Sequence, residues 1–174
     1  MNTSEIRKEN LINLYNDKGK RHGYWEYYYS DGQLAYKGNF VDGNRHGYWE
    51  WYYYDGKLSF KGSYLDGKAH GYWERYYVDG QLMDKGNFVN GKRHGYWEAY
   101  YENGKLDFKG NYVNGEPHGY WEAYYSDGDL DYKGYYDMGK RVDYNPDEPK
   151  VIELTLTDIA NKLGIDVDKL RIKD

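Results

Sequence analysis

Five histidines and five Glu–Lys pairs are the residues of this chain whose side chains could do chemistry. The histidines recur every 24 residues, at His22, His46, His70, His94 and His118. Imidazoles bind metals and exchange protons near neutral pH, so this regular series first suggests a metal or proton array. A glutamate follows each histidine after four residues and a lysine follows each glutamate after eleven. These pairs could supply general acids and bases.

The regular spacing argues against both kinds of chemistry. Equivalent positions in successive hairpins lie two strands apart, about 9–10 Å, whereas zinc holds its ligands at about 2 Å. No two of these histidines can therefore share a metal, and we expect turn residues that bond to the backbone or stack on rings. Five equal Glu–Lys pairs are better explained by sheet stabilisation than by catalysis. We predict no catalytic, cofactor-binding or metal-binding residues and no enzyme activity.

The composition excludes several further classes. The chain has no cysteine, which excludes a disulfide framework, a thiolate zinc site and a cysteine nucleophile. Its net charge of −5 does not favour nucleic acid or an anionic membrane lipid as a partner. Neither a signal peptide nor an apolar run of about 20 residues is visible. We expect a cytoplasmic protein.

The 24-residue interval indicates a repeat array, and the elements within one copy define its fold. In the first copy, residues 23–30 and 33–41 are rich in strand-forming side chains. Asp31-Gly32 between them is a strong signal for a tight hairpin turn, and Asp42-Gly43 turns the chain into the next copy. The connections are too short for parallel crossovers. The sequence predicts an all-β fold, an elongated single-layer antiparallel β-meander of 24-residue hairpin repeats.

Three regions follow from this pattern. We predict that residues 1–19 form a half-repeat with an opening strand and that residues 20–145 hold five repeats. Residues 146–174 are expected to form a linker and a small α/β cap. In the cap we predict a strand over 151–156 and a helix over 158–163, with Thr157 as its N-cap and Gly164 as its C-cap. A second strand or helix end is expected at 170–172.

Two-residue loops at both turns predict the register of the sheet. Trp25 then faces Gly38, and the next turn sets Trp49 opposite Tyr36; a three-residue loop, the weaker alternative, would set Trp25 against Lys37. One face is apolar, and the other carries the opposed pairs Glu26–Lys37, Glu50–Lys61, Glu74–Lys85, Glu98–Lys109 and Glu122–Lys133. Each glycine opposite a tryptophan makes room for the indole. The structural residues are Trp25, Trp49, Trp73, Trp97 and Trp121 with Gly38, Gly62, Gly86, Gly110 and Gly134.

The repeated unit Gly-Tyr-Trp-Glu-x-Tyr-Tyr-x-Asp-Gly-x-Leu-x-x-Lys-Gly-x-Phe-x-Asp-Gly-Lys-x-His resembles the MORN-repeat variant class over about residues 10–145. That class includes bacterial and phage proteins regarded as candidate antitoxins. The resemblance implies an elongated β-hairpin array used as an interaction surface. Standard MORN repeats also bind acidic lipids, which this acidic chain does not favour. Residues 156–165 resemble the first part of a helix-turn-helix and small modules of phage proteins, but no basic recognition helix follows.

Disagreement between the copies is the best guide to a binding site, because such a site must break the repeat. One pair of apolar-face positions reads Tyr27–Tyr36, Trp51–Phe60, Arg75–Asp84, Ala99–Phe108 and Ala123–Tyr132 in the five copies. The charged pair in the third copy could reflect compensated drift. It could also be a polar anchor in an aromatic surface, flanked by Trp51 and Phe108, since Arg and Trp are common interface hot spots. We predict a partner site at Trp51, Arg75, Asp84 and Phe108.

These features together predict a non-enzymatic protein–protein interaction scaffold, such as an adaptor, an antitoxin-like protein or an inhibitor, encoded either by a host or by a phage. The alternative is a carbohydrate- or small-ligand-binding module that uses its Tyr/Trp face. A column of tyrosines could then serve as a stacking rail for sugars or a peptide: Tyr28, Tyr52, Tyr76, Tyr100 and Tyr124. A second copy could also pair through the aromatic face as a homodimer. The sequence does not identify the partner.

Overall fold

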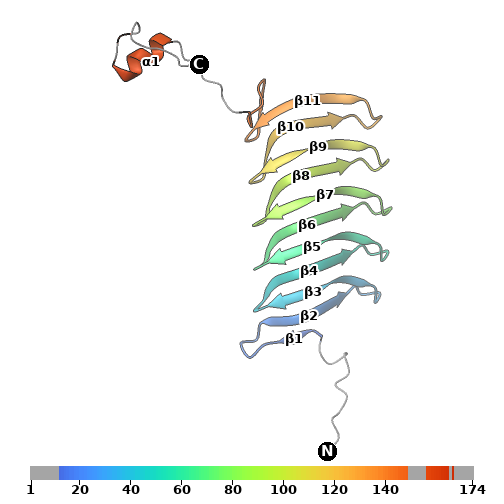
Figure 1. The fold of residues 1–174 in the computed structure, drawn as a ribbon. Helices are drawn as coiled ribbons and strands as arrows, with labels where there is room; N and C mark the ends of the chain where they lie inside the picture. The colour runs from blue at the N-terminus through green and yellow to red at the C-terminus, as the bar shows by residue number, and fades with distance from the viewer. Residues whose placement is uncertain (1–11, 149–155, 165, 167–174) are drawn as a thin grey trace, which may run out of the picture.

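The computed structural model describes residues 12–148, 156–164 and 166, and its repeats form one antiparallel sheet. The sheet has twelve strands in the order of the chain, each paired with its neighbours in sequence (Figure 1). The predicted all-β meander is confirmed. The strands are β1 (Leu14–Tyr15), β2 (Arg21–Tyr28), β3 (Leu34–Val41), β4 (Asn44–Tyr52), β5 (Leu58–Leu65), β6 (Lys68–Tyr76), β7 (Leu82–Val89), β8 (Lys92–Tyr100), β9 (Leu106–Val113), β10 (Glu116–Tyr124), β11 (Leu130–Asp137) and β12 (Lys140–Val142).

The turns between repeats are the two-residue loops that the sequence predicted. Val41 pairs with Asn44, so only Asp42 and Gly43 lie in the first of these turns. Both have positive φ, 49° for Asp42 and 88° for Gly43, which a type I′ turn requires and which Asp-Gly and Asn-Gly adopt readily. The Gly43 amide also donates to the Arg21 carbonyl at 2.9 Å, which ties this turn to the beginning of β2.

The turns within hairpins are longer than predicted. The Tyr29 amide donates to the Gln33 carbonyl at 2.8 Å, so the loop has three residues, 30–32. A three-residue loop alone would move Trp25 opposite Lys37. The structure nevertheless sets Trp25 opposite Gly38, because β3 contains an extra residue where Tyr27 pairs with Tyr36 and Tyr28 with Leu34. This β-bulge restores the register that the loop would have shifted.

The register between repeats also differs from the prediction. Val41, Phe40 and Asn39 pair as expected, but Gly38 then faces Trp49, and Tyr36 faces Trp51 instead of Trp49. Two extra residues, Gly47 and Tyr48, lie in the bulge of β4, and Gly47 has a φ of 70°. A glycine at this point allows the backbone to take a conformation that other residues adopt only with strain. Because the insertion has two residues, each side chain keeps its predicted face.

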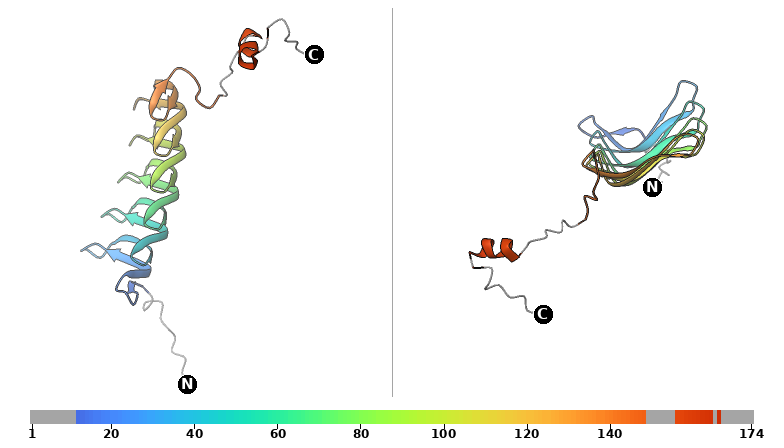
Figure 2. Two further views of the ribbon diagram at one scale, coloured as in Figure 1. Left: turned by 90° about the vertical axis from the view of Figure 1, so that its left-hand side faces the viewer. Right: turned by 90° about the horizontal axis from the view of Figure 1, so that it is seen from above.

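The sheet has two chemically different faces, and in the described part of the chain no second layer of strands covers either of them. The aromatic face carries the five repeat tryptophans, of which Trp49 is 0% exposed and Trp97 1%. Trp25, Phe40 and Trp49 form a buried cluster against which Tyr36, Trp51 and Tyr64 pack. The Glu–Lys face carries the charged pairs. The strands are curved across the sheet when it is viewed along its length (Figure 2).

The two ends of the sheet are shorter strands. β1 pairs Leu14 with His22 and Tyr15 with Arg21, as expected of an opening strand, and β12 pairs with residues 135–137 of β11. Helix α1 (Leu156–Leu163) is present where a helix was predicted, but it begins before Thr157, which is therefore not its N-cap. Gly164 follows it with a φ of 66°, as a C-cap glycine does.

Other parts of the predicted cap cannot be compared with the structure. The strand expected at 151–156 lies outside the described residues except for Leu156, which belongs to α1. The element expected at 170–172 and residues 1–11 also lie outside them. In the part of the chain that the structure describes, no helix has the length and apolar character needed to cross a membrane.

Candidate functional site

Four of the five repeat tryptophans, all except Trp25, join their own hairpin to the preceding one. An added Cβ on Gly86 would lie 2.3 Å from the indole of Trp97, and the Trp97 Nε1–H donates to the Asn87 carbonyl at 3.0 Å. The same contact joins Trp49 to Gly38, Trp73 to Gly62 and Trp121 to Gly110. The predicted packing of each indole on the glycine of its own hairpin was therefore wrong. Trp25 does face Gly38 in the register, but the indole that fills the space over Gly38 comes from the next repeat.

The four predicted partner-site residues lie in one row across the aromatic face. Neighbouring strands pair Trp51 with Phe60, Phe60 with Arg75, Arg75 with Asp84, Asp84 with Ala99, and Ala99 with Phe108. The row crosses six strands, β4 to β9, which corresponds to about 24 Å at the usual strand spacing. The structure thus places these side chains on one surface. Whether a partner binds there stays a prediction.

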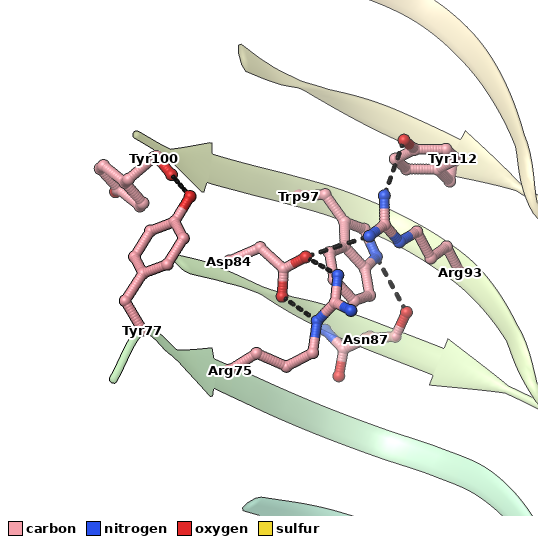
Figure 3. Close-up of polar contacts among 8 residues, drawn as sticks. All are labelled: Arg75, Tyr77, Asp84, Asn87, Arg93, Trp97, Tyr100 and Tyr112. Carbon is pink, nitrogen blue, oxygen red and sulfur yellow. Dashed lines mark hydrogen bonds and ion pairs between the residues drawn. The ribbon is translucent and has the colours of Figure 1, made fainter. Parts of the chain in front are cut away.

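The centre of this row is an ion pair (Figure 3). The Arg75 Nε–H donates to Asp84 Oδ1 at 2.7 Å, and its NH2 group bonds to Asp84 Oδ2. Asp84 is 3% exposed, whereas the Arg75 side chain is 45% exposed. The hydrogen bonds to Asp84 raise the pKa of the Arg75 guanidinium above its usual value, so the charge is permanent. The pair therefore presents a fixed cation at the surface above a buried anion.

A second arginine, which the sequence reasoning did not include, completes this cluster. The NH2 group of Arg93 donates to Asp84 Oδ2 at 3.0 Å, and its NH1 group donates to the Tyr112 hydroxyl at 3.0 Å (Figure 3). Its guanidinium also lies 4.4 Å from the ring centre of Trp97. Asp84 is thus shared by two arginines, which leaves the cluster with one net positive charge. The sequence does contain a signal for Arg93, because the equivalent position is also an arginine in the first two copies, Arg21 and Arg45.

Aromatic rings flank the ion pair on the side of the second repeat. The rings of Trp51 and Phe60 stack with centres 4.2 Å apart, and Trp51 also lies 5.3 Å from Trp49. On the other side, Ala99 is small, and Phe108 stacks on Trp121 at 5.2 Å. The charged site therefore lies between a continuous stack of rings and a more open part of the same face.

An open hollow lies at the hairpin turns of the second and third repeats, and its lining includes Met83, which precedes Asp84 in the chain. It has a volume of about 600 Å³ and is lined by Tyr53, Lys57, Tyr77, Val78, Asp79, Met83 and Glu102. Val78 lies at the start of the hairpin turn of the third repeat, and Met83 lies just after that turn. The equivalent residues of the fourth repeat are Glu102 and Asp107, so the third copy is apolar where the fourth is acidic. The sequence reasoning missed these two residues, although they too distinguish the third copy from others.

The Glu–Lys face repeats one arrangement at successive junctions. The predicted pairs, such as Glu98 and Lys109, do face each other in the register. The ion pairs, however, join Lys37 to Glu50 at 2.7 Å, Lys61 to Glu74 at 2.5 Å, Lys85 to Glu98 at 2.7 Å and Lys109 to Glu122 at 2.6 Å. The predicted opposition within hairpins is therefore confirmed, but each of these four lysines forms its ion pair with the glutamate of the next repeat.

Two tyrosines complete each of these charged sites. Tyr100 donates to Glu98 Oε2 at 2.7 Å and Tyr96 to Glu98 Oε1 at 3.2 Å. Hydrogen bonds from Lys85 and Tyr100 hold the pKa of the Glu98 carboxyl below its usual value. Partial burial and the bond to Glu98 raise the pKa of the Tyr100 hydroxyl. A carboxylate so engaged is a joint between repeats and a poor general base.

The histidines lie along the edge of the sheet that carries the turns between repeats. His46 Nδ1 is 3.7 Å from Asp66, in the turn that follows its hairpin, and His118 Nδ1 is 3.5 Å from Asp137, the last residue of β11 before that turn. The Met138 amide donates to His118 Nδ1 at 3.4 Å. Each of these contacts joins one histidine to a turn. Within the described residues, no three His, Cys, Asp or Glu side chains are grouped closely enough to hold a metal ion.

Comparison with known proteins identifies the repeat. The sequence profile described as MORN repeat variant matches residues 21–42, 45–66, 69–90, 93–114 and 117–138. Each matched segment covers one hairpin and ends at the first residue of the turn that follows it. No curated protein matches the chain.

Proposed function

The chain belongs to the MORN repeat variant family, and from this premise we propose that it is a non-enzymatic scaffold that binds another protein through its aromatic face. MORN repeats in general are modules for interaction with proteins or membranes and are generally not enzymes. The proposed contact residues are Trp51, Arg75, Asp84 and Phe108, with Arg75 at the centre. An adaptor, an antitoxin-like protein or an inhibitor would each use such a surface.

The observation that carries this proposal is the ion pair of the third repeat. Asp84 is buried on a face where the same position holds Tyr36, Phe60 or Phe108 in other copies. A buried ion pair is often no more stabilising than apolar side chains of similar volume, because both charges lose their hydration. The pair is therefore a weak contribution to stability at a place where rings would serve. This favours a role in recognition over a role in holding the array together.

The surroundings of Arg75 favour a protein as the ligand. Tryptophan and arginine dominate the energetics of many protein interfaces, and they do so where a partner excludes water. Trp51 and its stacked neighbour Phe60 supply apolar area beside the half-exposed guanidinium. The hollow lined by Val78 and Met83 lies at the hairpin turns of these repeats. A partner would place a carboxylate or carbonyl on Arg75 and an apolar side chain in the hollow.

Affinity capture with two matched double variants tests the proposal. The bait is the full-length protein, and the source is the cell in which the protein naturally occurs. The variant Arg75→Ala/Asp84→Ala removes the anchor, and Lys85→Gln/Glu98→Gln removes an ion pair on the opposite face of adjacent strands. We expect the first variant to lose the partner that the wild type captures, and the second to retain it.

Melting and light scattering complete this experiment. If Arg75→Ala/Asp84→Ala captures the same partner and melts at the same temperature as the wild type, the proposed site is wrong. If the wild type dimerises in solution and this variant does not, the partner on the aromatic face is a second copy.

A further inference from the structure

The C-terminal end of the sheet leaves half of β11 without a partner strand. β12 pairs with Tyr135, Tyr136 and Asp137, and the chain then leaves the sheet. On that side, none of the described residues pairs with Tyr132, Lys133 or Gly134. Unpaired N–H and C=O groups at a sheet edge are a template for a further strand. The unpaired part of β11 runs from Leu130 to Gly134, and its residues Tyr132–Gly134 correspond to positions that the next repeat covers at each interior junction.

The interior junctions show what such an edge binds. On β9, Phe108, Lys109 and Gly110 pair with Ala123, Glu122 and Trp121 of the next repeat. The indole of Trp121 lies 2.4 Å from where a Cβ on Gly110 would be, and its Nε1–H donates to the Asn111 carbonyl at 2.9 Å. Glu122 lies 2.6 Å from the Lys109 ammonium. At this junction a Trp-Glu dipeptide of one strand therefore pairs antiparallel with a Lys-Gly dipeptide of the other. The indole lies over the glycine, and the carboxylate bonds to the lysine.

The same two features are unsatisfied at the C-terminal edge. No indole covers Gly134; the atom nearest to its Cβ direction is the hydroxyl of Tyr132, at 2.5 Å. Lys133 is exposed, whereas Lys109 is half-buried, and no carboxylate among the described residues forms an ion pair with it. The Tyr132 side chain lies in the place of the missing tryptophan, where its hydroxyl donates to the Tyr135 carbonyl at 3.4 Å and the Arg141 guanidinium lies 4.0 Å from its ring centre. The edge thus has a glycine notch and a free cation at the spacing of the interior junctions.

The N-terminal end does not offer the complementary strand. Trp25 and Glu26 occupy the positions that would pair with Gly134 and Lys133 of another molecule. The Trp25 Nε1–H donates to the Leu14 carbonyl at 3.0 Å, and the Glu26 amide donates to Asn13 Oδ1 at 2.9 Å. Strand β1 lies against this end, and β12 lies against the other, so a head-to-tail junction between copies would bring the two short strands into collision. A second copy joined head to tail is therefore not the occupant of this edge.

We propose that the Tyr132–Gly134 edge of β11 binds an extended segment of another protein in which an aromatic residue is followed directly by an acidic residue. The segment pairs antiparallel to β11, as β10 pairs with β9. Its aromatic side chain lies over Gly134, and its carboxylate bonds to Lys133. Tyr132 moves aside into the stacked position that Phe108 holds against Trp121. This site is separate from the aromatic-face row at Arg75, and each can fail without the other.

A peptide taken from the array itself is the probe for this site. The capped hexapeptide Gly-Tyr-Trp-Glu-Ala-Tyr, the sequence of residues 119–124, is titrated into the full-length protein while amide chemical shifts are recorded. We expect the largest shifts at residues 130–134. Gly134→Ala should weaken binding at least about tenfold because a Cβ there meets the indole, and Lys133→Glu should weaken it by a similar factor through like-charge repulsion.

A charge exchange separates recognition from a general loss of structure. Lys133→Glu should bind the peptide in which lysine replaces the glutamate, whereas the matched control Lys109→Gln, whose junction is already occupied, should bind the original peptide as the wild type does. The proposal is overturned if the shifts lie elsewhere or are absent, or if the exchanged pair does not bind. It is also overturned if the protein self-associates through this edge, which light scattering of the wild type and Lys133→Glu would show.

Discussion

The two faces of this sheet are built from the same strands but differ in how strictly they repeat. On the Glu–Lys face, four successive junctions carry the same lysine-to-glutamate bond, and tyrosine hydroxyls bond to each of these glutamates. On the aromatic face the tryptophan–glycine contact repeats equally well, but the row beside it changes from rings to an ion pair to alanine. Contacts that hold neighbours together are kept, and the row that no junction requires is free to vary. That row is where specificity for a partner can be placed.

The largest effect is expected where the aromatic face holds two repeats together. Gly86→Ala places a Cβ on the Trp97 indole, whose side chain is almost fully buried. Because the ring must leave its site or the strands must separate, we expect a loss of about 3–5 kcal/mol in the free energy of unfolding. Urea denaturation measures it. Gly134→Ala is the control, since the atoms nearest to its added Cβ belong to the end of the Tyr132 side chain and to no indole, and a loss of similar size there would contradict the proposed junction.

A smaller effect is expected at the charged site of the same face. Asp84→Ala leaves Arg75 and Arg93 without their shared carboxylate. Removing one partner of a fully buried pair costs about 3–5 kcal/mol, and the exposure of Arg75 reduces this to roughly 2–3 kcal/mol. Arg75→Ala should cost less than Asp84→Ala, because Arg93 still neutralises the aspartate. Thermal denaturation of the two variants gives the order, and equal losses would show that Arg93 does not share the charge.

The Glu–Lys face should respond to pH. The pKa of Glu98 is lower in the folded protein than the value of about 4.3 in an unfolded chain. Its contribution to stability is therefore present above this value and lost as the pH falls through the lower folded pKa. The pKa of Tyr100 is raised, and that of Tyr24 is raised to about 12. Their contributions are present below the unfolded value of about 10 and are lost as the pH rises above it.

We therefore expect the melting temperature to be highest between about pH 5 and pH 10 and to fall on both sides. The variant Glu98→Gln, which costs about 0.5–1 kcal/mol near neutral pH as a partly exposed pair, should show a smaller fall in acid. An acid-side fall of the same size as in the wild type would mean that Glu98 is not among the groups that titrate with unfolding.

The fold could be predicted from the sequence because period, turn residues and alternation agree with one another. The register was predicted correctly within hairpins for a partly wrong reason. The turn near Asp31 has one more residue than predicted, and β3 contains one extra residue that cancels it. Alternation reports only which face a residue occupies. Two compensating insertions leave that face unchanged, so the alternation of apolar and polar residues cannot reveal them.

The direction of the contacts between repeats could not be predicted from the same pattern. A strand has two neighbours, and a facing pair such as Trp49 and Gly62 does not reveal which neighbour the indole covers. In the structure Trp49 lies over Gly38 and Lys37 bonds to Glu50. The alternation of residue types along a strand carries no information about which neighbouring strand a side chain contacts. The role of Arg93 was missed for a related reason, since its reach to Asp84 crosses from one strand to the next.

The most direct test of the claim that the third repeat serves recognition is to give it the sequence of the second. The double variant Arg75→Trp/Asp84→Phe carries the ring pair of Trp51–Phe60 and leaves Arg93 its contacts with Trp97 and Tyr112. Its free energy of unfolding and its capture of the partner are measured side by side. The account predicts stability that is unchanged or higher by up to about 1–4 kcal/mol, together with loss of the partner. A variant that is clearly less stable and still binds the partner would contradict it.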